Sequence, residues 1–139
     1  MIIMLNGTFG VGKTTVATAL QQRVVQSFIF DPEPVGMLVR TLTEGIRAGS
    51  EDTDDFQDIV LWRLLTITSA KGLYQQYQRP LIIPMTIIHP VYFSTIRSAL
   101  EEVAPVYHFC LQAPLAVIRE RLLKRGDDVG EWAWLLNVN

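Results

Sequence analysis

The sequence predicts an α/β fold in which helices flank both faces of a mostly parallel β-sheet. Short, continuous apolar runs, which suit strands covered on both faces, alternate with longer segments whose apolar residues recur at helical spacing. A glycine-rich loop also joins the first strand pattern to the first helix pattern. This alternation is typical of parallel sheets connected by right-handed crossovers.

The first elements begin close to the N-terminus. The apolar run 2–5 predicts a strand, and apolar residues four positions apart in 14–25 predict the helix that follows the glycine loop. A second strand is expected at 27–30 because the segment is β-branched and aromatic. We expect the closely spaced Pro32 and Pro34 to exclude regular structure directly after it.

Helical spacing continues in the middle of the chain. It predicts helices at 35–48 and 56–77, separated by the acidic segment 49–55, which we expect to be an exposed loop or a helix start. A third strand is expected at 80–87, where the internal Pro84 indicates an edge, a bulge or the strand end.

The last predicted elements are a helix at 90–102 that starts with proline, a strand at 106–112 and an arginine-rich helix at 114–125. The single cysteine, Cys110, lies in the strand pattern, and we expect its side chain to pack in the core. Glycines and aspartates at 126–130 end the last helix.

Composition limits the classes of function. The 139 residues support one domain spanning 1–139, and 49% hydrophobic with 19% charged residues is typical of a folded protein. A net charge of -2 provides no general basic field for nucleic acid or anionic lipid, so we expect neither as a partner. No apolar run reaches the ~18 residues that span a bilayer, and no signal-peptide pattern is present. We therefore expect a cytoplasmic protein without stable membrane insertion.

The glycine loop carries the most specific signal. Gly7, Gly12, Lys13 and Thr14 fit the Walker A pattern GxxxxGK[ST], placed between a strand and a helix as a phosphate-binding P-loop requires. Its glycines let backbone N–H groups point at phosphate oxygens. Lys13 is expected to contact the β- and γ-phosphates of ATP and to act in catalysis, and Thr14 to bind Mg²⁺. The expected nucleotide-binding residues are Gly7, Thr8, Phe9, Gly10, Val11, Gly12, Lys13, Thr14 and Thr15.

Asp31 is the candidate residue for contact with a phosphate acceptor. It follows the second strand, at the sheet edge where parallel α/β proteins bind ligands. It could take the proton of an attacking hydroxyl or hold Mg²⁺, which makes it a candidate catalytic, substrate-binding and metal-binding residue. The alternative is a turn aspartate that binds its own backbone before Pro32.

Other residues are weaker candidates. Arg121 and Arg125, four positions apart on the last helix, could converge on a transferring phosphoryl group, or could form a solvated basic face. His89 follows the third strand and could contact a substrate, although a loop histidine before proline is usually exposed. Trp62 could stack on a flat ring or pack in the core, and Arg63 could pair with an anionic substrate.

Neither strand pattern at 80–87 or 106–112 ends in a carboxylate, so a Walker B aspartate is not evident there. Motor ATPases and GTPases are disfavoured on this ground. Small-molecule kinases remain, because Asp31 can then bind magnesium or act as the base.

Beyond the Walker A motif, several segments resemble the tunicamycin-resistance ATP-binding proteins. These belong to the P-loop kinase group and are similar in fold to nucleoside monophosphate kinases and antibiotic phosphotransferases. The resemblance covers most of the chain up to about Arg125. It rests on segments 2–14, 31–33, 55–57, 61–63, 84–87, 89–90 and 121–122 and on Arg125.

The resemblance implies a P-loop NTPase or kinase-like fold and a substrate pocket over Asp31, the Trp62 helix and His89. It also implies a mobile lid at or after 121–125 and resistance to tunicamycin, a uridine-containing nucleoside antibiotic. Such kinases carry a fifth strand, an adenine-contacting loop and a closing helix. With 135–138 as a candidate for the start of that strand, we expect the chain to lack part of the lid or the C-terminus.

Together these patterns predict a kinase that uses ATP and Mg²⁺ to phosphorylate a small nucleoside-like molecule, with tunicamycin as the candidate. Two other interpretations stay open. The protein could bind ATP and sequester the antibiotic unmodified, or it could be a metabolic nucleotide kinase. The sequence carries no signal for the oligomeric state.

Overall fold

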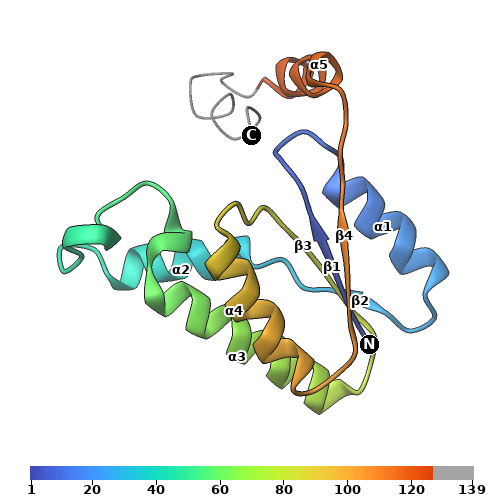
Figure 1. Cartoon of the computed structure of the whole chain (residues 1–139), viewed down its shortest axis with the longest axis horizontal. Helices are drawn as coiled ribbons and strands as arrows, with labels where there is room; N and C mark the ends of the chain where they lie inside the picture. Colours follow the sequence, from blue (N-terminus) through green and yellow to red (C-terminus); the bar gives the residue numbers. More distant parts are fainter. Residues whose placement is uncertain (127–139) are drawn as a thin grey trace.

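The computed structural model describes residues 1–126, whose arrangement is shown in Figure 1. The strands are β1 (Ile2–Asn6), β2 (Phe28–Ile29), β3 (Leu81–Met85) and β4 (Val106–Cys110). The helices are α1 (Lys13–Arg23), α2 (Glu33–Leu42), α3 (Val60–Tyr77), α4 (Pro90–Glu101) and α5 (Leu115–Arg125), with short 3₁₀ helices η1 (Gly49–Glu51) and η2 (Phe56–Asp58). The predicted break at 127–130 and strand start at 135–138 lie outside the described residues.

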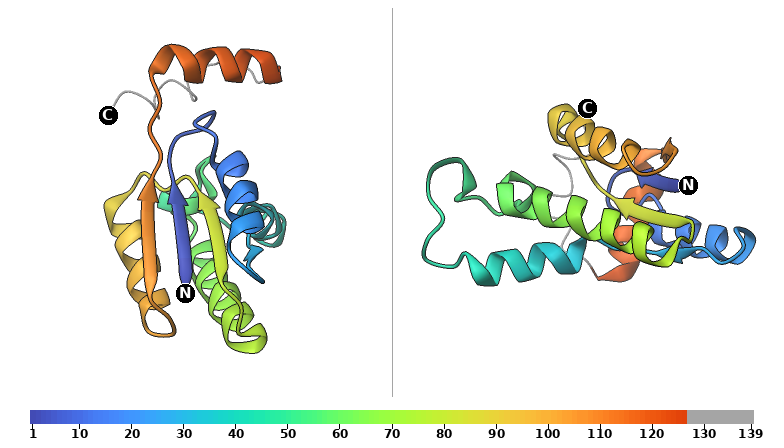
Figure 2. Two further views of the ribbon diagram at one scale, coloured as in Figure 1. Left: turned by 90° about the vertical axis from the view of Figure 1, so that its right-hand side faces the viewer. Right: turned by 90° about the horizontal axis from the view of Figure 1, so that it is seen from below.

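The four strands form one parallel sheet in the order β2-β3-β1-β4. The first strand is therefore central, and Ile2 pairs with Leu81 on one side and with Val106 on the other. All carboxyl ends meet at one edge of the sheet, where Figure 2 shows α5 lying beyond the loop that follows β1. The predicted α/β fold with a parallel sheet is confirmed.

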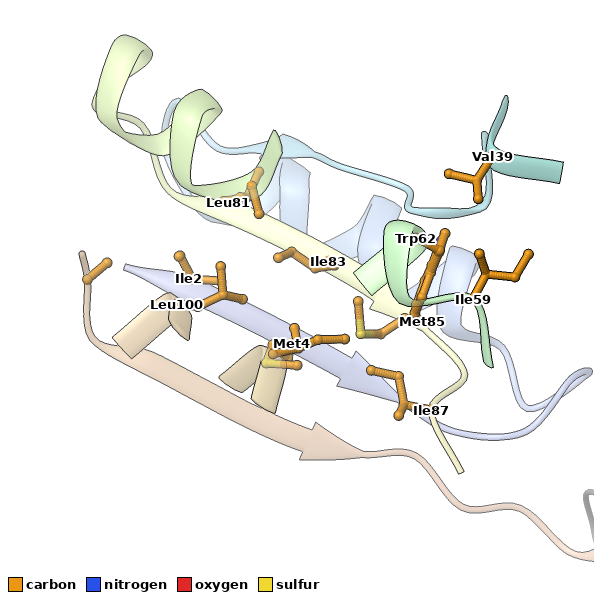
Figure 3. Packing of buried hydrophobic residues seen from close by; sticks show 13 residues of the cluster. Ile2, Met4, Val39, Ile59, Trp62, Leu81, Ile83, Met85, Ile87 and Leu100 are labelled. Carbon is orange, nitrogen blue, oxygen red and sulfur yellow. The ribbon is translucent and has the colours of Figure 1, made fainter. Parts of the chain in front are cut away.

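Helices cover both faces of this sheet because successive side chains of a strand point to opposite sides. Ile3 and Leu5 pack with Ala17 of α1 on one face. Ile2 and Met4 point to the other face, into the larger core beneath α3 and α4 that Figure 3 shows. Full burial of each such side chain contributes roughly 1.5–3 kcal/mol.

Helix α2 begins earlier than its sequence indicated. The expectation that Pro32 and Pro34 exclude regular structure was wrong, since Pro32 is the N-cap of α2 and Pro34 lies in its first turn. A helix leaves its first N–H groups unpaired, so proline loses no hydrogen bond there. The helix also ends at Leu42 rather than at 48, with Thr43 donating its hydroxyl to the Val39 carbonyl at 2.7 Å.

Pro84 occupies the end of an interior strand, which is one of the three placements that its sequence allowed. The carbonyl of Ile82 accepts a hydrogen bond from Phe30 N–H, on the β2 side of β3. The backbone of Pro84, two residues further along, faces that side as well. Strand β2 pairs with β3 only as far as Ile82, so it has ended before it reaches Pro84. The missing N–H of Pro84 therefore removes no ladder bond.

The expectation that Cys110 packs in the core was wrong, because its side chain is exposed. It lies on β4, an outer strand of the sheet formed by the described residues. Tyr107 and Phe109 on the same strand are each 52% exposed. Helix α1 packs over β1, β2 and β3 and leaves Tyr107 and Phe109 uncovered, whereas Cys110, the last residue of β4, points to the opposite face of the sheet. Within residues 1–126, no helix combines the length and apolarity required to cross a bilayer.

Candidate functional site

The glycine loop lies between β1 and α1, as the Walker A pattern predicts. Gly12 is the N-cap of α1 with a φ of 105°, and Gly10 has a φ of 78°. Residues with a side chain rarely adopt this left-handed backbone conformation, whereas glycine adopts it freely. A methyl group at Gly10 would also lie only 3.0 Å from Cγ of Leu122 on α5. The loop conformation and the close approach of α5 both depend on glycine.

Lys13 reaches back into the loop. Its Nζ donates hydrogen bonds to the carbonyl oxygens of Gly7 at 2.8 Å and Thr8 at 2.7 Å. The pKa of Lys13 is lowered from 10.5 to about 8, mainly by burial and also by the nearby Arg125 charge, while the Glu33 carboxylate opposes the shift. The ammonium group is therefore held in the concavity where a phosphate would be bound.

Asn6 and Thr86, which were not among the predicted site residues, hold the loop to the end of β3. Asn6 Oδ1 accepts hydrogen bonds from the N–H groups of Gly7 and Ile87, and Asn6 Nδ2 donates to the Ile87 carbonyl, each at 2.9 Å. Thr86 donates its hydroxyl to the Gly7 carbonyl at 2.9 Å. Both residues lie at the carboxyl ends of segments predicted to be strands, and this position could have identified them as site residues.

Helix α5 closes the loop from above. Arg121 Nη1 donates to the carbonyl oxygens of Val11 at 3.0 Å and Gly10 at 3.4 Å. Arg125 is close enough to Lys13 to lower its pKa. Arg121 and Arg125 both line the cavity beside the loop, whereas Arg119 does not. The structure thus brings together the two arginines predicted for the phosphoryl group.

This cavity has a volume of about 810 Å³, within the range of small-molecule sites. One end is the P-loop, with Thr14 and Thr15 at the start of α1. The other end has apolar walls and a few polar groups. The residues there are Asp31, Pro32, Glu33, Phe56, Gln57, Trp62, Pro84, Met85 and Thr86.

Asp31 is exposed and lines the cavity, in the predicted place beyond β2. Its Oδ1 accepts the Glu33 N–H at 2.9 Å, which is the turn arrangement given above as the alternative role. One carboxylate oxygen therefore shapes the start of α2. The residue combines the turn with a position on the cavity wall.

Trp62 is placed in the core rather than as a free stacking surface. Its side chain is 2% exposed, and its indole N–H donates to the Pro32 carbonyl at 3.2 Å. The indole ring contacts Phe56 in a tilted arrangement, with the two ring centroids 5.2 Å apart. Both rings line the cavity, and Phe56 is the more exposed of the two.

Arg63 and His89 are not brought to the P-loop, and neither lines the cavity. The Arg63 guanidinium lies 4.1 Å from the ring centroid of Tyr92 and donates to the Gln57 carbonyl. The His89 ring packs against the same tyrosine in a tilted arrangement, at a centroid distance of 4.6 Å. Tyr92 in turn donates its hydroxyl to Asp58 at 3.0 Å. Both predicted substrate contacts therefore belong to a cluster around Tyr92.

The oxygen donors at the cavity suit magnesium bound together with phosphates. Residues 1–126 contain no group of three His, Cys, Asp or Glu side chains placed to hold a metal ion. Mg²⁺ bound to a nucleotide takes only one or two protein ligands besides phosphates and water. The Thr14 hydroxyl and the carboxylates of Asp31 and Glu33 lie at the cavity and supply such oxygens.

Comparisons with known proteins agree with this geometry. The family model described as "AAA domain" matches residues 3–132. The tunicamycin resistance protein of Deinococcus radiodurans superposes with a TM-score of 0.74 and 36% identity, over 98% of this chain and 78% of that one. No curated protein matches the chain.

Two further solved structures support the fold. A sugar kinase from a Janibacter species has a TM-score of 0.64 and 22% identity, over 98% of this chain and 73% of its own. A gluconokinase from Sinorhizobium meliloti has a TM-score of 0.64 and 20% identity, over 97% and 70%. The chain thus belongs to the AAA domain family of P-loop kinase-like proteins, together with the tunicamycin resistance protein of Deinococcus radiodurans.

Proposed function

We propose that this protein is a kinase that transfers the γ-phosphoryl group of ATP to a hydroxyl of a small nucleoside-like acceptor, with tunicamycin as the candidate substrate. The D. radiodurans relative is described as a tunicamycin resistance protein, which suggests the acceptor. The P-loop and the kinase-like neighbours support the use of a nucleotide.

One observation carries the proposal. A single cavity of about 810 Å³ joins the phosphate-binding loop to a pocket that contains Asp31 and apolar side chains. A site that only bound a nucleotide would have no need of a second compartment next to the γ-phosphate. Holding donor and acceptor in one cavity removes much of the entropic barrier to their reaction.

Each residue then has a role in the transfer. The acceptor oxygen forms a bond to the γ-phosphorus while the bond to the β,γ-bridging oxygen breaks and ADP leaves. Asp31 orients the acceptor hydroxyl and takes its proton. Lys13, Arg121 and Arg125 offset the negative charge that spreads over the transferring oxygens.

Thr14, with Asp31 or Glu33, would hold Mg²⁺ against the phosphates. When bound, the ion neutralises phosphate charge and aligns the β- and γ-oxygens. The chain itself contributes the Thr14 hydroxyl and the Asp31 and Glu33 carboxylates, which line the same cavity as the N-terminus of α1.

The direct test is incubation with ATP, magnesium and tunicamycin, followed by mass spectrometry for one added phosphate. Asp31→Asn is the informative variant because an asparagine oxygen can still accept the Glu33 N–H, so the turn is kept while the charge is removed. Asp54→Asn, which changes an exposed carboxylate outside the cavity, is the matched control.

A phosphorylated product that is lost in Asp31→Asn and kept in Asp54→Asn supports the kinase and the role of Asp31. Binding of ATP and tunicamycin without any product would instead support sequestration. A panel of ordinary nucleosides and nucleoside monophosphates, assayed without the drug, tests the metabolic nucleotide kinase.

A further inference from the structure

Phe56 is the more exposed of the two aromatic rings, Phe56 and Trp62, at the acceptor end of the cavity. It belongs to the short helix η2, and its half-buried side chain lines the cavity and contacts the Trp62 indole. Pro32, Pro84 and Met85 line the same end. This end therefore offers an aromatic ring surrounded by apolar side chains.

The orientation of the Phe56 ring depends on a contact with α2. A methyl group at Gly36 would lie 2.6 Å from both Cγ and Cδ1 of the ring and 2.8 Å from Cδ2. Real side chains do not approach so closely, so only glycine at position 36 lets the ring lie directly against the helix backbone. Gly36 covers one face of the ring, and the Trp62 indole contacts the ring in a tilted arrangement with an interplanar angle of 47°, so the ring is held in one position.

The backbone under Phe56 is also fixed. Asp55 Oδ1 accepts the Gln57 N–H at 2.9 Å, and Arg63 donates to the Gln57 carbonyl. The Gln57 side chain donates its Nε2 to the Thr86 carbonyl, and Thr86 in turn bonds to the P-loop at Gly7. The ring is thereby positioned relative to the phosphate loop itself.

We infer that Phe56 determines the specificity of the site by stacking on a planar heteroaromatic ring of the acceptor, whose reacting hydroxyl then lies toward Asp31. This inference rests on the proposed function. A preformed aromatic surface favours a flat ring because stacking adds to the apolar burial that an alkyl chain would also gain. The polar Gln57 at the same end suits a heterocycle with hydrogen-bonding edges better than a purely apolar group.

The test measures the dissociation constants of uridine and tunicamycin by isothermal titration calorimetry in wild type and Phe56→Leu. Leucine keeps much of the apolar volume and removes the ring, so an alkyl ligand should bind it nearly as well. For a stacked ring we expect about tenfold weaker binding of both ligands. The affinity for ATP should stay the same, which also shows that the variant is folded.

Tyr77→Leu is the matched control, since it removes a ring outside the cavity at the far end of α3. Gly36→Ala is the second variant, and it should weaken both ligands by displacing the Phe56 ring. Unchanged affinity for both ligands in Phe56→Leu, or no binding of either ligand to wild type, would overturn the inference.

The two proposals can fail separately. Ligand binding that is weakened in Phe56→Leu, but without any phosphorylated product, would refute the kinase and keep the ring-binding site. A phosphorylated drug whose KM is unaffected in Phe56→Leu would keep the kinase and refute the role of Phe56.

Discussion

Arg121 donates a hydrogen bond to the backbone of Val11 at 3.0 Å, which joins the last described helix to the phosphate loop across 110 positions of the chain. The bond holds a guanidinium in the wall of the cavity that Lys13 also lines. Because the bonds to Gly10 and Val11 both use Nη1, the guanidinium keeps further N–H groups for a phosphate.

We expect Arg121→Ala to lower kcat on the order of 10³-fold, since the charge is lost where the transferring phosphoryl group would lie. Arg119→Ala, on the same helix but outside the cavity, is the control and should leave kcat close to wild type. Steady-state kinetics, with a thermal melt to check folding, measure both. Equal kcat values in the two variants would exclude a transition-state role for Arg121.

Binding of ATP should be coupled to proton uptake above neutral pH. The pKa of Lys13 is lowered to about 8 in the protein alone, so the group loses its proton as the pH rises through that value. Phosphate charges stabilise the ammonium form and raise the pKa again. At about pH 8.5 we expect uptake on the order of half a proton per ATP, and almost none from this group at about pH 6.5.

Calorimetry in buffers of different ionisation enthalpy measures this uptake. Lys13→Arg is the control, because arginine stays protonated throughout this range. If that variant takes up as many protons as wild type, Lys13 is not the group that titrates.

Gly10 and Gly45 form a matched pair for testing how closely α5 approaches the loop. Their φ angles are 78° and 76°, but a methyl group would meet Leu122 at Gly10 and nothing within 4 Å at Gly45. Alanine should destabilise either site by roughly 1–2 kcal/mol through backbone strain. Only Gly10→Ala should add a steric term and weaken ATP binding.

Urea denaturation and ATP titration measure the Gly10 and Gly45 variants. Similar losses of stability, with ATP affinity unchanged in both, would show that α5 does not restrict the loop.

Asn6→Ala removes three hydrogen bonds that hold the loop to the end of β3. It leaves the N–H groups of Gly7 and Ile87 without their acceptor, at a cost on the order of 2–3 kcal/mol in the free energy of unfolding. Thr95→Ala, which removes one exposed bond within α4, should stay near wild type. Chemical denaturation measures the free energy of unfolding of both variants. A loss below about 0.5 kcal/mol in Asn6→Ala would show that water replaces these bonds.

The strongest sequence predictions concerned contacts between near neighbours in the chain. The Walker A loop is defined by glycines, Lys13 and Thr14 within a few positions, so strand, loop and helix were predicted together. The prediction that Pro32 and Pro34 exclude regular structure was wrong because proline also suits the first turn of a helix. The core expectation for Cys110 failed because a strand pattern does not say whether the strand lies at the edge of its sheet.

The acceptor end of the cavity could not be predicted in the same way. Arg63 and His89 have suitable chemistry, yet packing against Tyr92 directs them elsewhere. Phe56 adjoins the cavity because Gly36, on another helix, allows its ring to approach. Contacts of this kind depend on how helices pack, and single-residue patterns carry no information about them.

The central position of β1 also sets the order of assembly. Ile2 pairs with Leu81 and Val106, so the strand that carries the phosphate loop leaves the ribosome long before either of its partners. Its ladder bonds close only across large sequence separations, which makes this step slow. The phosphate loop is therefore translated before the strands that support it, and a nascent chain that stops before β3 should have no affinity for ATP.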